Sequence, residues 1–198
     1  MAICVLTGDI VGSMRLHRAQ FERVQLLLED SYYDIKEDTS GSLDQFRGDG
    51  WQMAFDNRHE SLRFALYIRA TLKANDDDFD TRIAISESDA EYLISNDYDD
   101  VYVASGRALD DMPRDTLMAH ANGGALHATT LLVDQISREW TQAQARAIKP
   151  FLLRNVRHTQ KSVAAALGIS RQAVGQALEA ACYPVISRAL RAIEEQAK

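Results

Sequence analysis

Proline, glycine and cysteine are scarce in this chain of 198 residues. With 3 Pro and 10 Gly, the composition excludes collagen-like and linker-rich proteins. No apolar run approaches the roughly 18 residues that a membrane span needs, so we expect no contact with a membrane. The first residues predict a strand and carry no basic segment, which argues against a signal peptide. The two cysteines, Cys4 and Cys182, form no metal-binding spacing and indicate a reducing, cytoplasmic setting.

Apolar residues make up 46% of the chain and charged residues 26%, which is typical of globular proteins. The charge is divided unevenly. Residues 141–198 hold nine Lys or Arg and three Asp or Glu, a net charge of +6, so the total of −7 leaves −13 for residues 1–140. We therefore expect an acidic body over 1–140 and a basic tail domain over 141–198 that faces nucleic acid. The alternative is two solvated surfaces whose charges differ by chance.

Apolar periodicity predicts the elements of the body. Strands are expected over 2–7, 43–47, 51–55 and 81–86, and helices over 17–36 and 60–74. The order β-α-β-β-α-β is typical of the ferredoxin-like arrangement, so the expected fold class is α+β. The pattern is weaker further on: short strands or loops at 92–94 and 101–103, a helix over 104–111, one strand within 116–129 and a helix over 131–140.

Two aspartates are expected to meet at one end of this sheet. Asp9 ends the first strand, and Asp49 lies in the turn between the second and third strands. Since the first and third strands are neighbours in a ferredoxin-like sheet, both carboxylates would face one shallow crevice. Mg²⁺ prefers one or two carboxylates together with phosphate oxygens. The alternative is that Asp9 is an ordinary helix cap and Asp49 an ordinary turn residue.

Small residues surround both aspartates and would let a phosphate chain approach the backbone. They are Gly8, Gly12, Gly48 and Gly50. The start of the helix after Val11, Gly12 and Ser13 would supply free N–H groups for the anion. The segment as a whole predicts a site for a nucleotide bound with a metal.

These segments resemble known motifs. The opening metal-binding motif of class III nucleotidyl cyclases resembles Thr7-Gly8-Asp9-Ile10-Val11-Gly12-Ser13, and their second motif is similar to Arg47-Gly48-Asp49-Gly50-Trp51. A fuller resemblance, over nearly the whole chain, is to the SatD-like family, which shares the Gly-Asp-Ile-Val-Gly-Ser start, a Gly-Asp-x-aromatic-Gln segment and a C-terminal helix-turn-helix. It implies a palm-like fold with Asp9 and Asp49 as ligands of Mg²⁺ or Mn²⁺, to which we add Ile10. The candidate nucleotide-binding residues are Gly8, Val11, Gly12, Ser13, Gln45, Arg47, Gly48 and Gly50.

The chain departs from the pattern of active cyclases. Gln45 stands where cyclases often have a base-selecting Lys, and Val103 stands at an Asn position if Arg107 is the phosphate-stabilising Arg. Groups that stabilise developing phosphate charge usually make the largest catalytic contribution, so turnover is more doubtful than binding. Arg107 is the candidate catalytic residue; Arg47 or Arg114 could take its place.

The tail predicts a helix-turn-helix. After a helix over 142–156 that is interrupted early at Lys149 and Pro150, the pattern gives a first helix over 159–167, a tight turn at Gly168, a second helix capped by Ser170, and a last helix over 185–196. The apolar residues between the two central helices are expected to pack together, with Val163, Ala164 and Leu167 facing Ile169, Val174 and Leu178. The candidate DNA-binding residues are Lys161, near phosphates, and Ser170, Arg171, Gln172 and Gln176, near base edges. The alternative is a helical hairpin used for packing or dimerisation.

We therefore expect a cytoplasmic DNA-binding regulator whose body binds a nucleoside triphosphate or related nucleotide with Mg²⁺ or Mn²⁺. The family resemblances imply a homodimer. A second interpretation is an active nucleotidyl cyclase, in which the ribose 3′-hydroxyl attacks the α-phosphate and the tail localises or regulates the enzyme. A third is a scaffold in which both sites have been lost.

Overall fold

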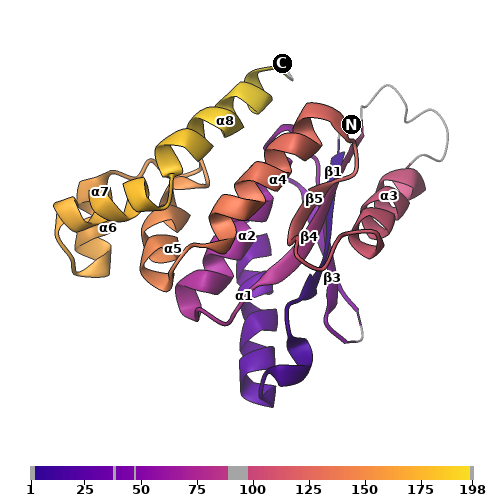
Figure 1. Ribbon diagram of the computed structural model, residues 1–198, viewed down its shortest axis with the longest axis horizontal. Coiled ribbons are helices and arrows are strands. Elements are labelled where there is room, and N and C mark those ends of the chain that lie inside the picture. Colours follow the sequence, from indigo (N-terminus) through magenta and orange to yellow (C-terminus); the bar gives the residue numbers. More distant parts are fainter. Residues whose placement is uncertain (1–2, 38, 47, 89–97, 197–198) are drawn as a thin grey trace.

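A mixed five-stranded sheet organises the part of the chain that the computed structural model describes, residues 3–37, 39–46, 48–88 and 98–196 (Figure 1). Its strand order is β2-β3-β1-β4-β5. The first six main elements follow the predicted order: β1 (Ile3–Ile10), α1 (Arg18–Lys36), β2 (Gly41–Gln45), β3 (Gly50–Phe55), α2 (Ser61–Asn75) and β4 (Thr81–Ser88). Antiparallel pairs join β1 to β3, β1 to β4 and β2 to β3. The first and third strands are thus neighbours, as expected.

The weaker region folds into α3 (Tyr98–Asp110), β5 (Met118–His120) and α4 (Gly124–Arg138). The short strand considered at 101–103 is wrong, because these residues lie within α3; the one at 92–94 lies outside the described residues. The strand expected within 116–129 is β5, which pairs in parallel with β4 at the sheet edge. The helix expected over 131–140 starts earlier, at Gly124, where positive φ angles at Gly123 and Gly124 turn the chain.

Helices cover both faces of the sheet (Figure 1). Along β1, Cys4, Leu6 and Ile10 join the main core with α1 and α2, while Val5 belongs to a smaller cluster with Val101 of α3. Because side chains alternate along a strand, Thr7 and Asp9 share the α3 side with Val5. The sheet therefore has an apolar face toward α1 and α2 and a more polar face toward α3.

Helix α2 is buried on nearly all sides, from Ser61 to Lys73. One side faces the sheet, and the tail packs against the other. Three cations on α2 are paired within this interior: Arg69 with Asp80 and Asp134, Arg63 with Glu194, and Lys73 with Asp80. A helix without a polar face is typical of such two-sided burial.

The tail comprises α5 (Gln142–Ile148), α6 (Gln160–Leu167), α7 (Arg171–Ala180) and α8 (Tyr183–Gln196). The interruption predicted at Lys149 and Pro150 is confirmed, because α5 passes there into the 3₁₀ turn Lys149–Phe151, but the helix does not continue to 156. Apolar tail residues, among them Ile148, Val174 and Leu178, belong to the same core cluster as the body. The indole of Trp140 also donates to the carbonyl of Ala181 at 3.0 Å. Body and tail thus share one hydrophobic core.

Among the described residues, none of the helices combines the length and the apolar character that crossing a bilayer would require.

Candidate functional site

The pairing of β1 with β3 brings Asp9 and Asp49 together. Asp9 lies opposite Gly50 in the antiparallel register, so Asp49 is adjacent to it along the hairpin. The amide of Ile10 donates to the carbonyl of Asp49 at 3.1 Å and closes this end of the sheet. Both aspartates are partly exposed. The strand register thus places the two aspartates that the sequence analysis singled out at the same end of the sheet, and Ile10 bonds to Asp49 through the backbone.

The hairpin and the loop after β1 hold Asp49. Gly48 has φ of +99°, a left-handed conformation that a side chain would strain, which explains a glycine in this turn. The hydroxyl of Ser13 donates to Oδ2 of Asp49 at 2.5 Å. Gly12 also has a positive φ, and it carries the chain into the 3₁₀ turn Ser13–Arg15. Arg47 lies outside the described residues.

Asp9 is paired with a cation that the sequence analysis did not assign to the site. Arg82, directly opposite Asp9 on β4, places Nη1 at 3.2 Å from Oδ2 of Asp9. Its Nη2 donates to the carbonyl of Leu109, in the last turn of α3, and to that of Met112, just after the helix. Partial burial raises the pKa of the Asp9 carboxyl; Arg82 opposes this rise and the charge of Asp49 adds to it. The sequence pattern did not assign Arg82 to the site, because its position opposite Asp9 depends on the register of β1 and β4.

The oxygen ligands at this site suit a hard divalent cation that needs only one or two ligands from the protein. Within the described residues, no group of three or more His, Cys, Asp or Glu side chains gathers as a metal cluster. Two aspartates from neighbouring segments nevertheless supply the one or two carboxylates that Mg²⁺ usually takes from a protein, and the ion completes its shell with water and phosphate oxygens. Burial raises the pKa of the Asp9 carboxyl most and the charge of Asp49 adds to the rise, and a bound cation would favour the ionised form of this carboxyl. Arg82 would have to share or release Asp9.

A second positively charged side chain that the sequence analysis did not assign to the site, that of Arg15, lies in the loop after β1. A Cβ built on Gly12 would stand 2.7 Å from Nη2 of Arg15, so the guanidinium lies across this glycine. Val11, Gly12 and Arg15 line one wall of a polar hollow of about 250 Å³, and Gln20 and Asp78 line others. The signal for Arg15 was its place two residues after Ser13. The loop thus combines a positive side chain with glycine backbone.

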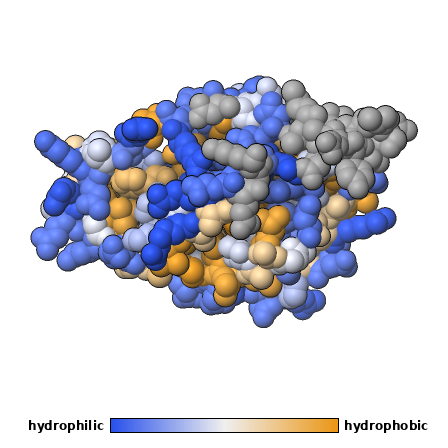
Figure 2. All heavy atoms as spheres, turned by 90° about the horizontal axis from the view of Figure 1, so that it is seen from above, coloured by the Kyte–Doolittle hydropathy of each residue, from blue (hydrophilic) through white to orange (hydrophobic). Residues whose placement is uncertain are grey.

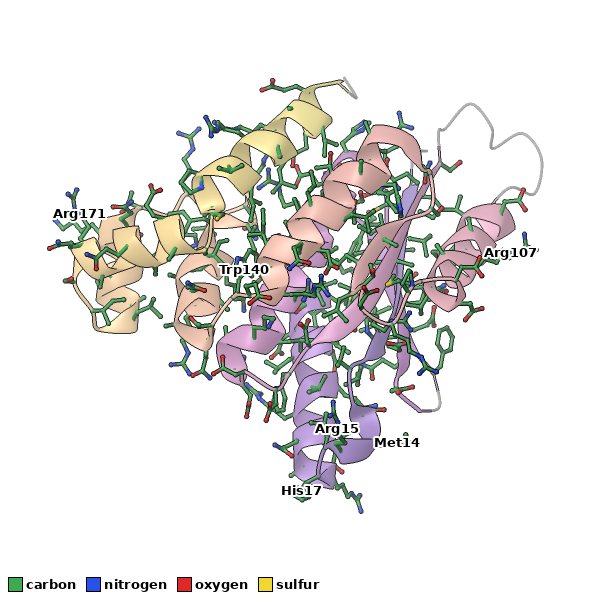
Figure 3. The ribbon with its side chains drawn as sticks, in the orientation of Figure 1. Met14, Arg15, His17, Arg107, Trp140 and Arg171 are labelled. Carbon is green, nitrogen blue, oxygen red and sulfur yellow. The ribbon has the colours of Figure 1, made fainter. Side chains whose placement is uncertain are left out.

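Three predicted residues lie elsewhere. Gly8 is buried, and a Cβ there would come within 2.4 Å of the Trp51 ring, so packing accounts for this glycine. Gln45 donates its amide to the carbonyl of Gln25, on the α1 side of the sheet rather than the side of Asp9. Arg107 is exposed on α3 (Figure 3), and among the described residues it forms no hydrogen bond or ion pair with either aspartate.

The tail contains two helices joined by a tight turn, as expected. Thr159 caps α6 by accepting from the amide of Ser162, and Ser170 caps α7 by accepting from the amide of Ala173. Gly168 ends α6 in the left-handed conformation, with φ of +67°. Ile169, which was expected to pack between the helices, is instead 45% exposed because it lies in the turn itself.

The candidate DNA-binding residues of the tail are accessible to solvent. Lys161, Ser170, Arg171, Gln172 and Gln176 are all exposed. A hollow of about 570 Å³ runs along α7, lined by Gln160, Arg171, Gln172, Gly175, Gln176 and Glu179. Arg171 marks the end of the molecule farthest from Arg107 (Figure 3), and hydrophilic side chains cover this tail end in the view from above (Figure 2).

Comparisons with known proteins bear on the fold alone. No protein-family model and no curated protein matches the chain. A solved structure that does is the active GGEEF domain of a diguanylate cyclase from Vibrio cholerae, with a TM-score of 0.51 and 13% identity. The match covers 63% of this chain and 85% of that one. The chain thus contains a mixed α+β fold similar to a cyclase domain.

Proposed function

We propose that this chain is a DNA-binding regulator whose cyclase-like body binds a nucleotide with Mg²⁺ or Mn²⁺. The observation that carries the proposal is the pairing of β1 with β3, which sets Asp9 beside Asp49. The similarity to a diguanylate cyclase domain supports a nucleotide as the ligand. In this proposal the body is a ferredoxin-like, SatD-like palm and the tail is a helix-turn-helix.

In this proposal, different residues at the site bind the metal ion and the phosphates of the nucleotide. Asp9 and Asp49, with the carbonyl of Ile10, would hold the metal ion, which would offset the negative charge of the phosphates. Ser13, now bonded to Asp49, and Arg15, now over Gly12, would contact phosphate oxygens. An arginine suits this task because its guanidinium donates in a planar fork to phosphate.

The exposed surface of α7 supports the DNA-binding half of the proposal. Ser170, as the helix cap, starts α7, so Arg171 and Gln172 lie in its first turn, where a recognition helix contacts base edges. Arg171 suits guanine and Gln172 suits adenine. Lys161 on α6 would contact a phosphate and contribute affinity without sequence preference.

Contiguous packing could couple the two halves. Helix α2 contacts the sheet on one side and α5 on the other, and α5 contacts α7. Nucleotide binding that shifts the β1–β3 end would therefore act on α7 through packed helices. A homodimer would turn this shift into a change in the spacing of two recognition helices, which must fit half-sites about 34 Å apart.

The nucleotide arm is tested by equilibrium binding and by product analysis. The purified protein is incubated with each of the four ribonucleoside triphosphates and Mg²⁺ or Mn²⁺, and affinity is measured by calorimetry. We expect Asp49→Asn to abolish binding and to leave DNA affinity nearly intact, while Asp110→Asn, at an exposed carboxylate of α3, binds as wild type. Equal loss of nucleotide and DNA binding in Asp49→Asn would contradict separate sites.

The DNA arm is tested by selection from a random duplex library with the full chain. We expect Arg171→Ala to lose about 1–3 kcal/mol of discrimination at one base position. Arg188→Ala removes the same charge from an exposed position on α8 and serves as the matched control. An identical effect of both variants would mean that binding is only electrostatic, and no enrichment at all would leave the tail without a DNA role.

A second candidate function is that of an active nucleotidyl cyclase. The observation in its favour is the fold similarity to a domain described as an active diguanylate cyclase. Mass spectrometry of the same incubations distinguishes the two. A cyclic product that is lost in both Asp9→Asn and Asp49→Asn would establish the enzyme; intact triphosphates with tight binding would favour the regulator.

A further inference from the structure

The hairpin that carries Asp49 has an aromatic ring exposed to solvent, and this ring belongs to Phe46 rather than to Trp51. Trp51 is 1% exposed, and its indole donates to the hydroxyl of Thr81 at 2.9 Å, so it belongs to the core. Phe46, in contrast, is 51% exposed. It directly follows β2, and its amide donates to the carbonyl of Gly50 at 3.0 Å. The hairpin thus buries one ring and presents the other.

The ring of Phe46 lies over Gly50, on the face of the sheet that carries the side chain of Asp9. A Cβ built on Gly50 would stand 3.5 Å from Cδ2 of Phe46. Gly50 is opposite Asp9 in the register, and paired residues of neighbouring strands project to the same side of the sheet. Neighbouring strands are about 4.8 Å apart, so the ring lies within the reach of a nucleotide whose phosphates are near Asp9.

A polar side chain with a fixed orientation lies on the same face. Gln52 is two residues beyond Gly50, and its Nε2 donates to Oγ1 of Thr7 at 2.7 Å. Thr7 is also 2.7 Å from the hydroxyl of Ser105, which donates to the carbonyl of Tyr102. Since the Ser105 proton is used there, Thr7 donates to Ser105 and accepts from Gln52. These hydrogen bonds use Nε2 of Gln52 as a donor to Thr7, so the carbonyl oxygen of Gln52 is the atom that can accept a hydrogen bond from a ligand.

We propose that Phe46 and Gln52 form the base-binding part of the nucleotide site. The base stacks on the exposed ring of Phe46 above Gly50, and an N–H group at its edge donates to the carbonyl oxygen of Gln52. A purine is favoured, because its two fused rings cover more of the phenyl face than a pyrimidine does. The inference rests on the proposed function, since it concerns the nucleotide whose phosphates and metal are assigned to Asp9 and Asp49.

Binding of ligands with and without a base tests this assignment. The full-length protein is titrated in Mn²⁺ with the four ribonucleoside triphosphates and with inorganic tripolyphosphate, which has the charge but no base. We expect Phe46→Leu to weaken purine nucleotide binding about tenfold, the order expected for one base–aromatic stack, and to leave tripolyphosphate affinity unchanged. Phe46→Trp should retain purine affinity. Gln52→Leu should weaken nucleotides without affecting tripolyphosphate.

A matched control is Tyr33→Leu, which removes an aromatic ring with similar exposure, 57%, from α1. It should bind every ligand as wild type does. Three results would overturn the inference while leaving the proposed function intact: wild-type affinity of Phe46→Leu for purines, an equal loss of tripolyphosphate binding, or equal affinity of the wild-type protein for tripolyphosphate and nucleotides. A wild-type protein that binds neither ligand would reject the proposed function and this inference with it.

Discussion

A buried ion pair joins the tail to the body, and its removal should destabilise the whole molecule. Glu194 of α8 accepts from Nε and Nη2 of Arg63 on α2, at 2.7 and 3.0 Å. The side chains are only 4% and 5% exposed. Nη1 of Arg63 donates to the carbonyl of Leu152 at 3.1 Å. Arg154 also pairs with Glu194, but its side chain is 44% exposed.

These contacts set the expected size of the effect. Glu194→Ala would leave the buried guanidinium of Arg63 with one carbonyl partner, and breaking a buried pair in this way costs about 3–5 kcal/mol. Arg154→Ala should cost at most about 1 kcal/mol, because half-exposed ion pairs contribute little. Replacing both partners, Arg63→Met with Glu194→Leu, removes the unpaired charge and should restore most of the lost stability.

Urea unfolding, followed by circular dichroism and tryptophan fluorescence, measures these differences. Because the tail shares its core with the body, both signals should change in one transition. A loss below about 1 kcal/mol for Glu194→Ala, or a double variant as unstable as the single one, would refute the buried-pair reasoning. Two separate transitions would instead make 1–140 and 141–198 independent folding units.

Three further predictions concern single residues. Gly8→Ala would set a Cβ 2.4 Å from the Trp51 ring, so we expect a loss of about 1–3 kcal/mol in urea unfolding; wild-type stability would contradict that packing. Gly175→Ala meets nothing closer than the Gln160 side chain at 3.6 Å, so it should stabilise α7 by about 0.4–1 kcal/mol and raise Tm, and a lower Tm would count against it. The raised pKa of Asp9 means that the folded protein binds a proton at this carboxyl more readily than the unfolded chain does. The free energy of unfolding of the wild type should therefore rise relative to that of Asp9→Asn as pH falls through the raised pKa toward 3.8. A difference between the two proteins that does not change with pH would contradict this prediction.

The local elements of the body could be predicted because each has a strong pattern. Helix α1 shows apolar residues at helical spacing, and the structure buries Val24, Leu28, Tyr32 and Ile35 on one face. The neighbourhood of Asp9 and Asp49 followed from the element order alone, since that order makes the first and third strands pair. Residues 98–140 carried a weaker pattern than the rest of the chain, and α3 was missed at its start.

The side-chain partners at the site depended on register, which the sequence does not state. A shift of one residue moves a strand's side chains to the opposite face. Gln45 was placed with the nucleotide, but its pairing with Trp51 turns it toward α1. Arg82 and Phe46 were overlooked for the same reason, because only the pairings Asp9 with Arg82 and Asp9 with Gly50 bring them to the aspartates.

The packing of the tail against the body did have a sequence signal, and it lies in α2. From Ser61 to Asn75 this helix has no continuous polar face, and its three cations, Arg63, Arg69 and Lys73, are separated by apolar residues. A helix that covers only a sheet keeps a polar side for water. The missing polar side therefore indicates a second layer of protein, which α5 and α8 supply. An acidic body and a basic tail that differ in charge can still fold around one core, because basic residues of the tail such as Lys161, Arg171 and Arg188 are exposed to solvent.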